Sequence, residues 1–466
     1  MGQQMENIRE IALDTLLEME KGSSYSHQVI TAVMNKYDYL DGHSKAFYKR
    51  LVEGTTERRL ELDYLLDQYS GIPVRKMKPL IRCLMRMSLY QILYMDNVPD
   101  AAACNEGVKL AARRNFHNLK GFVNGVLRNM ARNKDALAYP DPIKEPGLYL
   151  SVKYSMPEWL ISLWQDAYGR EITVKLLEGL QQIQPVSIRF TKAYTGNNME
   201  KYLERIRETG AKTERSSYLD YAAWVSDLAG VTALPGYYEG AFTVQDISSM
   251  LCVEAAGLGK DSRVLDVCAA PGGKSLFACE RAVTVTAGDI SAGRLERLKE
   301  SAERLKVHNI TTRQWDATVF DEDSRESADV LFLDVPCSGL GVIGKKSDIK
   351  YNVSESGMEE IIKRQKEIIG CCYRYVKKGG ILIYSTCTIN PGENEEIFRW
   401  ILQELPFSPD GMEAFIPAVL WKQKQCLKET GFGGGMSEAE WNACFQCLPG
   451  LMRTDGFFIA RMKRTG

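Results

Sequence analysis

The sequence lacks long runs of apolar residues and any excess of one charge. No stretch of its 466 residues reaches the roughly 18 to 20 apolar positions that a membrane-spanning helix needs. The formal net charge is −1, from 59 basic and 60 acidic side chains, which excludes a nucleic-acid binder that is basic throughout. Hydrophobic residues make up 45% and charged residues 26%, which excludes a disordered or fibrous chain.

Signals for export and for metal binding are also scarce. The first 21 residues hold no apolar core followed by a cleavage site, and Glu6 stands where myristoylation of Gly2 would need serine or threonine. The 12 cysteines are distributed over the long chain without a dense spacing pattern, which favours reduced thiols over a disulfide-stapled secreted fold. Cys444 and Cys447 form a lone C-x-x-C, and with only four histidines in the chain we expect no metal site. We therefore expect a cytoplasmic protein with no membrane partner.

The first of roughly three domains, residues 1–140, is predicted to be all-helical. Apolar residues recur at helical spacing, and the prolines at 73, 79 and 99 stand where helices could start. Residues 107–134 carry seven basic side chains and no acid. This cluster could neutralise RNA phosphates, with Arg113 and Arg114 as candidate contacts, or be a solvated helix face, and charge alone leaves both interpretations open.

A proline- and glycine-rich loop at 139–147 leads into a second module, residues 141–242, which we expect to be a small α+β module that links domains or binds RNA. In residues 243–466, buried-type strands alternate with helices. This pattern predicts a parallel α/β sheet covered on both faces, with ligands at the carboxyl ends of its strands. Strands are expected at 264–267, 283–289, 310–315, 330–334 and 380–385, and helices at 292–305 and 358–376.

The first strand of this sheet runs into a glycine turn that lets the backbone come close to a ligand. A Walker A phosphate loop would need a glycine at position 268, and the dinucleotide fingerprint does not fit either. The helix that follows favours negative charge at its N-terminus, so the turn suits a ligand carboxylate. The turn consists of Cys268, Ala269, Ala270, Pro271, Gly272, Gly273 and Lys274.

Two acidic residues follow the next strands. Asp289 ends the second strand, where an acid can bond the two hydroxyls of a ribose, and Asp316 follows the third, where it can reach the exocyclic amine of adenine. A ribose, an adenine and an amino-acid end together describe S-adenosyl-L-methionine (SAM), which we expect as the cofactor. The alternative is that both acids only cap helices or turns.

Two cysteines, Cys337 and Cys387, follow the ends of the fourth and fifth strands. A buried cysteine is usually inert packing. These two stand among proline, glycine, serine and threonine rather than leucine or isoleucine, which indicates a chemical role.

Three segments carry a family resemblance. DVCAAPGGKS, DVPCSGLG and YSTCTINPGENEE resemble motifs I, IV and VI of the RNA cytosine-5 methyltransferases of the Sun (RsmB-like) family, and the likeness covers residues 245–466. The N-terminal region is similar to the NusB antitermination fold, which binds RNA. Together they imply a multidomain fold: an all-α NusB-like domain, a small α+β linker module and a class I, Rossmann-like methyltransferase domain that acts on 16S rRNA.

The implied chemistry explains why two thiols are present. C5 of cytosine is a poor nucleophile, and a thiolate that adds to C6 activates it. Spacing does not decide which cysteine attacks. The resemblance implies that Cys387 is the nucleophile and that Cys337 assists product release. Asp334 could contact N3 of the base or the methyl donor, and Lys274 would help to order the pocket.

Reaching C6 requires a cytosine outside its stack. Lys345, Lys346 and Lys350 beside Tyr351 suit phosphate and base contact, although a solvated loop is the alternative. The family usually has His-Pro before Asp348, where this chain has Lys-Ser, and Arg-Val-Asn where residues 189–191 are Arg-Phe-Thr.

Two other functions stay open at this point. The same reaction could act on tRNA or on another rRNA position, or the chain could be a non-catalytic RNA-binding factor of the NusB type. The complete set of thiols and donor residues disfavours the second. We expect a monomer that binds RNA and not DNA, and the sequence does not name the cytosine.

Overall fold

The computed structural model describes residues 7–22, 26–228 and 230–466. Gly2 and Glu6, on which the prediction about myristoylation depends, lie outside the described residues. The chain divides into two compact units. Unit 1 contains Met1–Asp166 and Lys345–Asn352, and unit 2 contains Ala167–Gly344 and Val353–Gly466. Unit 1 thus continues past the predicted boundary at 140, and the small α+β module shares unit 2 with the larger sheet. None of the described helices combines the length and apolar character needed to cross a membrane.

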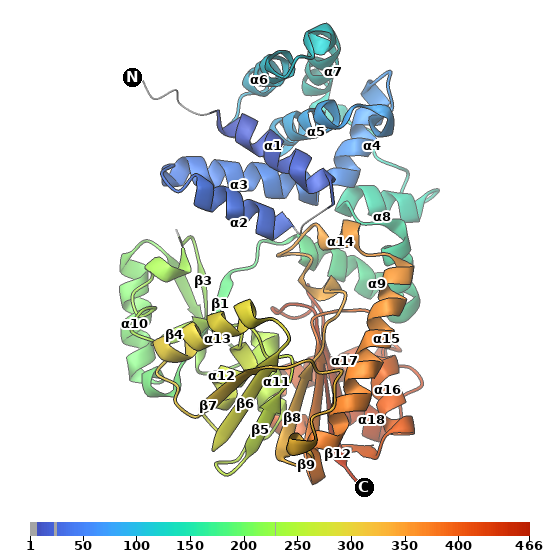
Figure 1. Cartoon of the computed structure of the whole chain (residues 1–466). Coiled ribbons are helices and arrows are strands. Elements are labelled where there is room, and N and C mark those ends of the chain that lie inside the picture. The colour runs from blue at the N-terminus through green and yellow to red at the C-terminus, as the bar shows by residue number, and fades with distance from the viewer. Residues whose placement is uncertain (1–6, 23–25, 229) are drawn as a thin grey trace. The chain divides into compact units, whose positions relative to one another are not determined.

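Unit 1 is helical throughout its described elements, as predicted (Figure 1). Helix α5 supplies most of its core because eleven of its residues are buried. Pro79 occupies the first turn of α5, where its missing N–H is not needed. The helices are α1 (Ile8–Glu20), α2 (Ser26–Lys36), α3 (Gly42–Glu57), α4 (Arg59–Tyr69), α5 (Pro79–Tyr94), α6 (Asp100–Arg113), α7 (Lys120–Arg132), α8 (Pro146–Tyr154) and the short α14 (Ile349–Asn352).

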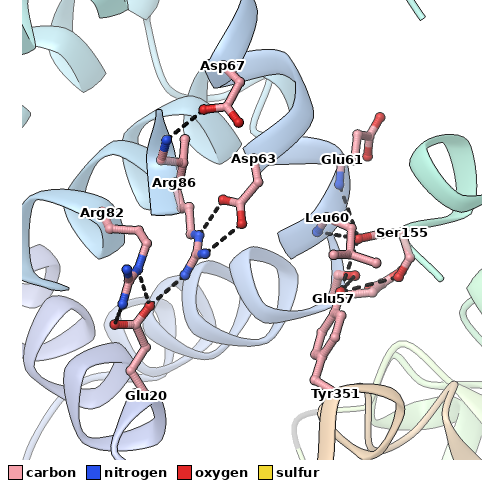
Figure 2. A network of polar contacts seen from close by, with 11 residues as sticks. Glu20, Glu57, Leu60, Glu61, Asp63, Asp67, Arg82, Arg86, Ser155 and Tyr351 are labelled. Carbon is pink, nitrogen blue, oxygen red and sulfur yellow. Dashed lines mark hydrogen bonds and ion pairs between the residues drawn. The ribbon is translucent and has the colours of Figure 1, made fainter. Parts of the chain in front are cut away.

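The segment Lys345–Asn352 is bonded into unit 1 although it follows residue 344 of unit 2 in the chain. The hydroxyl of Tyr351 donates to the carbonyl of Glu57 at 3.0 Å and lies 3.1 Å from Ser155 Oγ (Figure 2). The guanidinium of Arg59 stacks 3.7 Å from the centre of the Tyr351 ring. Asp348 accepts hydrogen bonds from Ser26 N at 2.8 Å and Ser26 Oγ at 2.5 Å. The segment is therefore a structural part of the helical unit.

Unit 2 begins within α9 (Glu158–Gln181) and contains a four-stranded antiparallel sheet in the order β2-β3-β1-β4. The strands are β1 (Val186–Phe190), β2 (Lys212–Arg215), β3 (Ala222–Ser226) and β4 (Phe242–Val244), with α10 (Asn197–Glu208) between β1 and β2. The sequence pattern missed β2, whose residues Lys-Thr-Glu-Arg have no apolar alternation. They form an edge strand with largely exposed side chains.

The larger sheet has the order β10-β12-β9-β8-β5-β6-β7, with β11 paired to β12. Strands β5, β6, β7, β8 and β9 are parallel, which confirms the prediction. Strands β10, β11 and β12 run antiparallel and extend it. The bounds are β5 (Arg263–Asp266), β6 (Thr284–Asp289), β7 (Ile310–Gln314), β8 (Ala328–Asp334), β9 (Val376–Thr386), β10 (Phe407–Pro409), β11 (Cys444–Cys447) and β12 (Phe457–Arg464).

Helices cover both faces of this sheet. Adjacent residues of a strand point to opposite faces of a sheet. Leu265 of β5 lies in a buried cluster with residues of α15 and α16, whereas Asp266 bonds Ser275 of α12, so these helices cover opposite faces. Strand order reverses at β5, which has β6 on one side and β8 on the other, so the carboxyl ends of β5 and β8 form a topological switch point. The helices are α11 (Ile247–Ala255), α12 (Gly273–Ala278), α13 (Ala292–Arg304), α15 (Glu355–Cys372), α16 (Glu395–Glu404), α17 (Ala418–Glu429) and α18 (Glu438–Ala443).

Candidate functional site

The carboxyl edge of the parallel strands carries the candidate residues that the motifs predicted. Cys268 follows β5, Asp289 ends β6, Asp316 follows β7, Asp334 ends β8 and Cys387 follows β9. Because parallel strands present their carboxyl ends at one edge, residues that are more than a hundred positions apart in sequence meet there.

The glycine turn after β5 packs closely against the side chain of Leu298. Gly272 has a φ of +104°, and a Cβ there would lie 2.6 Å from Cγ of the buried Leu298. Only glycine fits this position without strain or displacement. Helix α12 starts at the next residue, and its Ser275 Oγ donates to Asp266 Oδ2 at 2.6 Å. Burial raises the pKa of Asp266 to about 7, against the lowering effect of that hydrogen bond.

Asp289 connects the turn to β6. Its side chain is 2% exposed, and its carboxylate accepts hydrogen bonds from Ala270 N at 3.2 Å and Ser291 N at 2.9 Å. Arg294 Nη1 lies 3.3 Å from Asp289 Oδ2. Since each carboxylate oxygen can accept two hydrogen bonds, Ala270 and Arg294 together occupy Oδ2, whereas Oδ1 keeps a lone pair for a further donor.

Asp316 has a turn-capping role as well. Its Oδ1 accepts from Thr318 N at 2.9 Å and from Thr318 Oγ1 at 2.6 Å, and these bonds lower the pKa of Asp316. The side chain of Asp316 is 41% exposed. Asp316 Oδ1 therefore caps the turn, as the alternative interpretation of this residue expected. The side chain is still exposed enough for a ligand to reach it.

Lys274 and Asp334 form an ion pair across the switch point. Lys274 Nζ lies 2.7 Å from Asp334 Oδ2, and Ser385 Oγ donates to Asp334 Oδ1 at 2.9 Å. Burial by itself would lower the pKa of Lys274, but the Asp334 carboxylate raises it above its usual range. Lys274 therefore stays charged and fixes the orientation of Asp334. Ser385 belongs to the third motif, but the sequence did not assign it a role, since nothing in the motif shows that its hydroxyl contacts Asp334.

The two predicted cysteines meet. Cys337 Sγ and Cys387 Sγ lie 3.3 Å apart and are hydrogen-bonded. The pKa of Cys337 is raised well above its usual value, first by that hydrogen bond, then by burial and by the charges of Cys387, Glu393 and Asp334. The two thiols therefore share one local environment, in which the hydrogen bond between them and burial both oppose ionisation of Cys337. The third cysteine of the edge, Cys268, also has a raised pKa because it is buried near acids, so it is poorly suited to be a nucleophile.

The predicted RNA-contact residues in unit 1 differ in exposure. Lys345 and Lys346 are exposed, and so is Arg113, which lies 3.8 Å from Glu10, whereas the half-buried Arg114 pairs with both Glu10 and Asp14 of α1. Lys350 is only 2% exposed, and burial lowers its pKa to about 7. A side chain buried among helices cannot reach a phosphate from this position, so the expectation for Lys350 is corrected.

A hollow between α6 and α7 was not predicted residue by residue. Its lining includes Lys109 and Lys120, which both belong to the basic stretch and are exposed. Arg128, also exposed, bonds Asn105 of this hollow at 3.2 Å. The sequence shows that residues 107–134 are basic, but only the packing of α6 against α7 shows that Lys109 and Lys120 line the same hollow.

The lone C-x-x-C lies on strand β11, where Cys444 and Cys447 are buried and pair with Ala460 and Phe457 of β12. Within the described part of the chain, no group of three or more histidine, cysteine or acidic side chains is arranged to hold a metal ion.

Comparison with known proteins identifies two segments. Residues 257–463 match the model of the 16S rRNA methyltransferase RsmB/F family, and residues 6–132 match that of the NusB family. A protein of Bacillus subtilis is 33% identical over 467 residues, with 99% of each chain covered. Ribosomal RNA small subunit methyltransferase B of Proteus mirabilis is 30% identical over 469 residues, with 98% of this chain and 99% of the relative covered.

Two crystal structures share the fold. PH0851 matches with a TM-score of 0.77 and 20% identity, over 99% of this chain and 100% of its own. NSun6 from Pyrococcus horikoshii, solved with SFG, matches with a TM-score of 0.54 and 20% identity, over 66% of this chain and 98% of its own.

Proposed function

The chain belongs to the RsmB/F family of 16S rRNA methyltransferases, and on that premise we propose that it methylates C5 of a cytosine in 16S rRNA with SAM as donor and Cys387 as nucleophile. The observation that carries this proposal is the 3.3 Å contact between Cys337 Sγ and Cys387 Sγ beside the carboxyl end of β8. One thiol is needed to attack the base, and a second group is needed to complete the reaction.

The residues at the edge of the sheet suit SAM. The turn at Gly272 packs against Leu298 more closely than any residue with a Cβ would allow, and the buried Asp289 has a lone pair left on Oδ1 for a ribose hydroxyl. Asp316 is exposed beside them and can accept from an adenine amine. SAM supplies an electrophilic methyl group. Cys268, Ala269, Ala270, Pro271, Gly273 and Lys274 would form the rest of the site.

The side chains have distinct roles in this scheme. The Cys387 thiolate adds to C6 of a cytosine that is held outside its stack, and the new S–C6 bond makes C5 nucleophilic. After C5 is methylated, a general base takes the C5 proton, the electron pair of the C5–H bond re-forms the C5=C6 double bond, and the S–C6 bond breaks with its electron pair returning to Cys387 as the thiolate. Cys337 assists this release, and Asp334, oriented by Lys274 and Ser385, accepts a hydrogen bond from the N3 of the base, which becomes protonated as the thiolate adds to C6.

RNA contacts outside the reacting base are proposed for the exposed basic residues of unit 1. These are Lys345, Lys346 and Arg113, together with Lys109 and Lys120 of the α6–α7 hollow. Three of the candidate residues also pair with acids: Arg114 with Glu10 and Asp14, Arg113 with Glu10 at 3.8 Å, and Lys109 with Glu106 at 2.7 Å. We also propose that the protein acts in the cytoplasm, where its rRNA substrate is made, and as a monomer.

Bisulfite sequencing of rRNA and tRNA from cells with and without this gene tests the proposal. We expect the loss of one 5-methylcytosine in 16S rRNA, whereas a loss confined to tRNA would contradict the substrate. In vitro, Cys387→Ala should abolish both methylation and the covalent RNA adduct. Cys337→Ala should instead let the adduct accumulate, since release is impaired while attack is not. Full activity of Cys387→Ala would disprove the assignment.

A further inference from the structure

Glu393 is a fully buried carboxylate to which the covalent scheme gives no role. It lies in the loop between β9 and α16, and its side chain is 0% exposed. Burying a carboxylate is unfavourable unless hydrogen bonds compensate it. Its position within the GENEE segment of the third motif gave no indication of what it contacts.

The carboxylate of Glu393 accepts four hydrogen bonds from neutral donors. Its Oε2 accepts from Ser338 N at 2.8 Å and from Gln365 Nε2 at 3.1 Å. Its Oε1 accepts from Ser338 Oγ and from Asn390 Nδ2 at 3.0 Å. Two of the four bonds therefore fix Ser338, the residue that directly follows Cys337.

The same hydrogen bonds continue to the other cysteine. Ser338 Oγ lies 2.8 Å from Thr388 Oγ1, and Thr388 directly follows Cys387. Since the Ser338 hydroxyl donates its proton to Glu393, its oxygen is left to accept from Thr388. A second link joins the two loops, because Gly341 N donates to the carbonyl of Cys387 at 3.0 Å.

Helix α15 closes the arrangement on the other side of Cys337. Gln365 Nε2, which bonds Glu393, also donates to the carbonyl of Pro336 at 3.0 Å. Cys337 is thus held between two residues whose backbone groups bond Gln365 and Glu393. Tyr384 OH donates to the carbonyl of Glu393 at 2.5 Å, which fixes the backbone of Glu393 to β9.

We propose that Glu393 is a positioning residue that holds the Cys337 loop and the Cys387 loop together, so that the two sulfur atoms stay in contact during the reaction. This inference rests on the proposed function for its catalytic meaning, but the geometry it asserts can be tested without RNA or SAM. Its charge contributes as well, because Glu393 is one of the acids that raise the pKa of Cys337, after the Cys387 hydrogen bond and burial.

The test measures how readily the two thiols can be joined. Diamide oxidises two thiols to a disulfide and is itself reduced to a hydrazine, and peptide mass spectrometry quantifies the Cys337–Cys387 disulfide over time. Glu393→Ala should slow this reaction by about tenfold or more, since several of its bonds to the two loops are lost. Glu393→Gln, which keeps one oxygen, should fall between Glu393→Ala and the wild type.

Glu396→Gln is the matched control, because Glu396 is exposed in the first turn of α16 and should leave the rate unchanged. Should Glu393→Ala fail to fold, Glu393→Gln and Ser338→Ala carry the test: Glu393→Gln replaces one acceptor oxygen, and Ser338→Ala removes the hydroxyl bonds to Glu393 and Thr388 but keeps the backbone bond. Disulfide formation at the wild-type rate in the folded variants would overturn the proposal.

Methylation assays test whether this positioning matters for catalysis. Glu393→Ala should lower kcat by about a hundredfold, the size of loss that a misplacement of about 1 Å can cause. Its KM for RNA and its Kd for SAM should stay near the wild-type values, which a general loss of structure would not permit, although its unfolding midpoint should fall because buried donors lose their acceptor. If the wild type methylates no cytosine while the disulfide result holds, the proposed function fails and the positioning role stands.

Discussion

Lys274 Nζ contacts Asp334 Oδ2 at 2.7 Å, and this ion pair joins helix α12 to the end of β8. The side chain of Lys274 is 9% exposed, so its ammonium group depends on Asp334 for compensation. Burial of a charge without its partner is strongly unfavourable, which makes the pair a sensitive point of both the fold and the site.

Asp334→Asn should therefore lower the free energy of unfolding by about 3 kcal/mol, because the Lys274 charge stays buried without a counterion. The double variant Asp334→Asn with Lys274→Met should recover most of this loss, since neither charge remains. Urea unfolding of the wild type, both single variants and the double variant gives the coupling energy. Simple additivity of the two single effects would show that the pair is not coupled.

Gly272→Ala should lower both stability and SAM affinity. The residue has a φ of +104°, and the added Cβ would lie 2.6 Å from Leu298 Cγ. Overpacking of this kind costs about 1 to 3 kcal/mol. Titration calorimetry with SAM and thermal unfolding measure the two effects. Gly293→Ala, in the first turn of α13, is the control: a Cβ there meets no atom within 4 Å, so the protein should be unchanged or slightly more stable.

Asp266 should make stability depend on pH. Burial raises its folded pKa to about 7 from an ordinary value of 3.8. The folded state then holds this proton more tightly than the unfolded state, so the contribution of Asp266 to stability grows as pH falls from about 7 to about 4 and is lost as pH rises through 7. Asp266→Asn should remove this slope from unfolding free energies measured across that range.

Glu395 gives a comparison for the same experiment, because burial also raises its pKa to about 7. Glu395→Gln should remove a similar slope, and the double variant should flatten the profile further. An unchanged slope in Asp266→Asn would mean that this carboxyl group does not titrate in the predicted range.

Lys350→Met should stabilise unit 1 at pH 6. Burial lowers the folded pKa of Lys350 to about 7 from 10.5, so the charged form is unfavourable in the folded state. The penalty is full below pH 7 and declines as pH rises toward 10.5, and the gain from methionine should decline with it. Thermal unfolding at pH 6 and pH 9 measures this difference.

RNA binding separates Lys350 from its neighbours. The exposed Lys345 and Lys346, changed together to glutamine, should weaken RNA binding and reduce its salt dependence, because counterion release falls with each lost phosphate contact. Lys350→Met should leave both unchanged. A reduced salt dependence in Lys350→Met would contradict the buried position of this side chain.

The sequence by itself determined most of the elements and named the residues that we propose for the chemistry. Helical spacing predicted the helices of residues 1–140, buried apolar strands predicted β5 to β9, the position at a strand end indicated Asp289, and the motifs named the glycine turn and the two cysteines. These features are local: a strand is encoded by its own apolar residues, and a tight turn by the glycine that its backbone requires.

Only the tertiary structure decided which residues are buried and which residues from distant segments contact one another. The sequence could not tell that Lys350 is buried while Lys345 is exposed, because burial depends on the helices of unit 1 that are far away in the chain. It gave Glu393 no role, since its partners Ser338 and Gln365 come from other segments. The 3.3 Å contact of the cysteines likewise arises from the adjacency of β8 and β9, and pairing between distant strands is a property of the whole sheet.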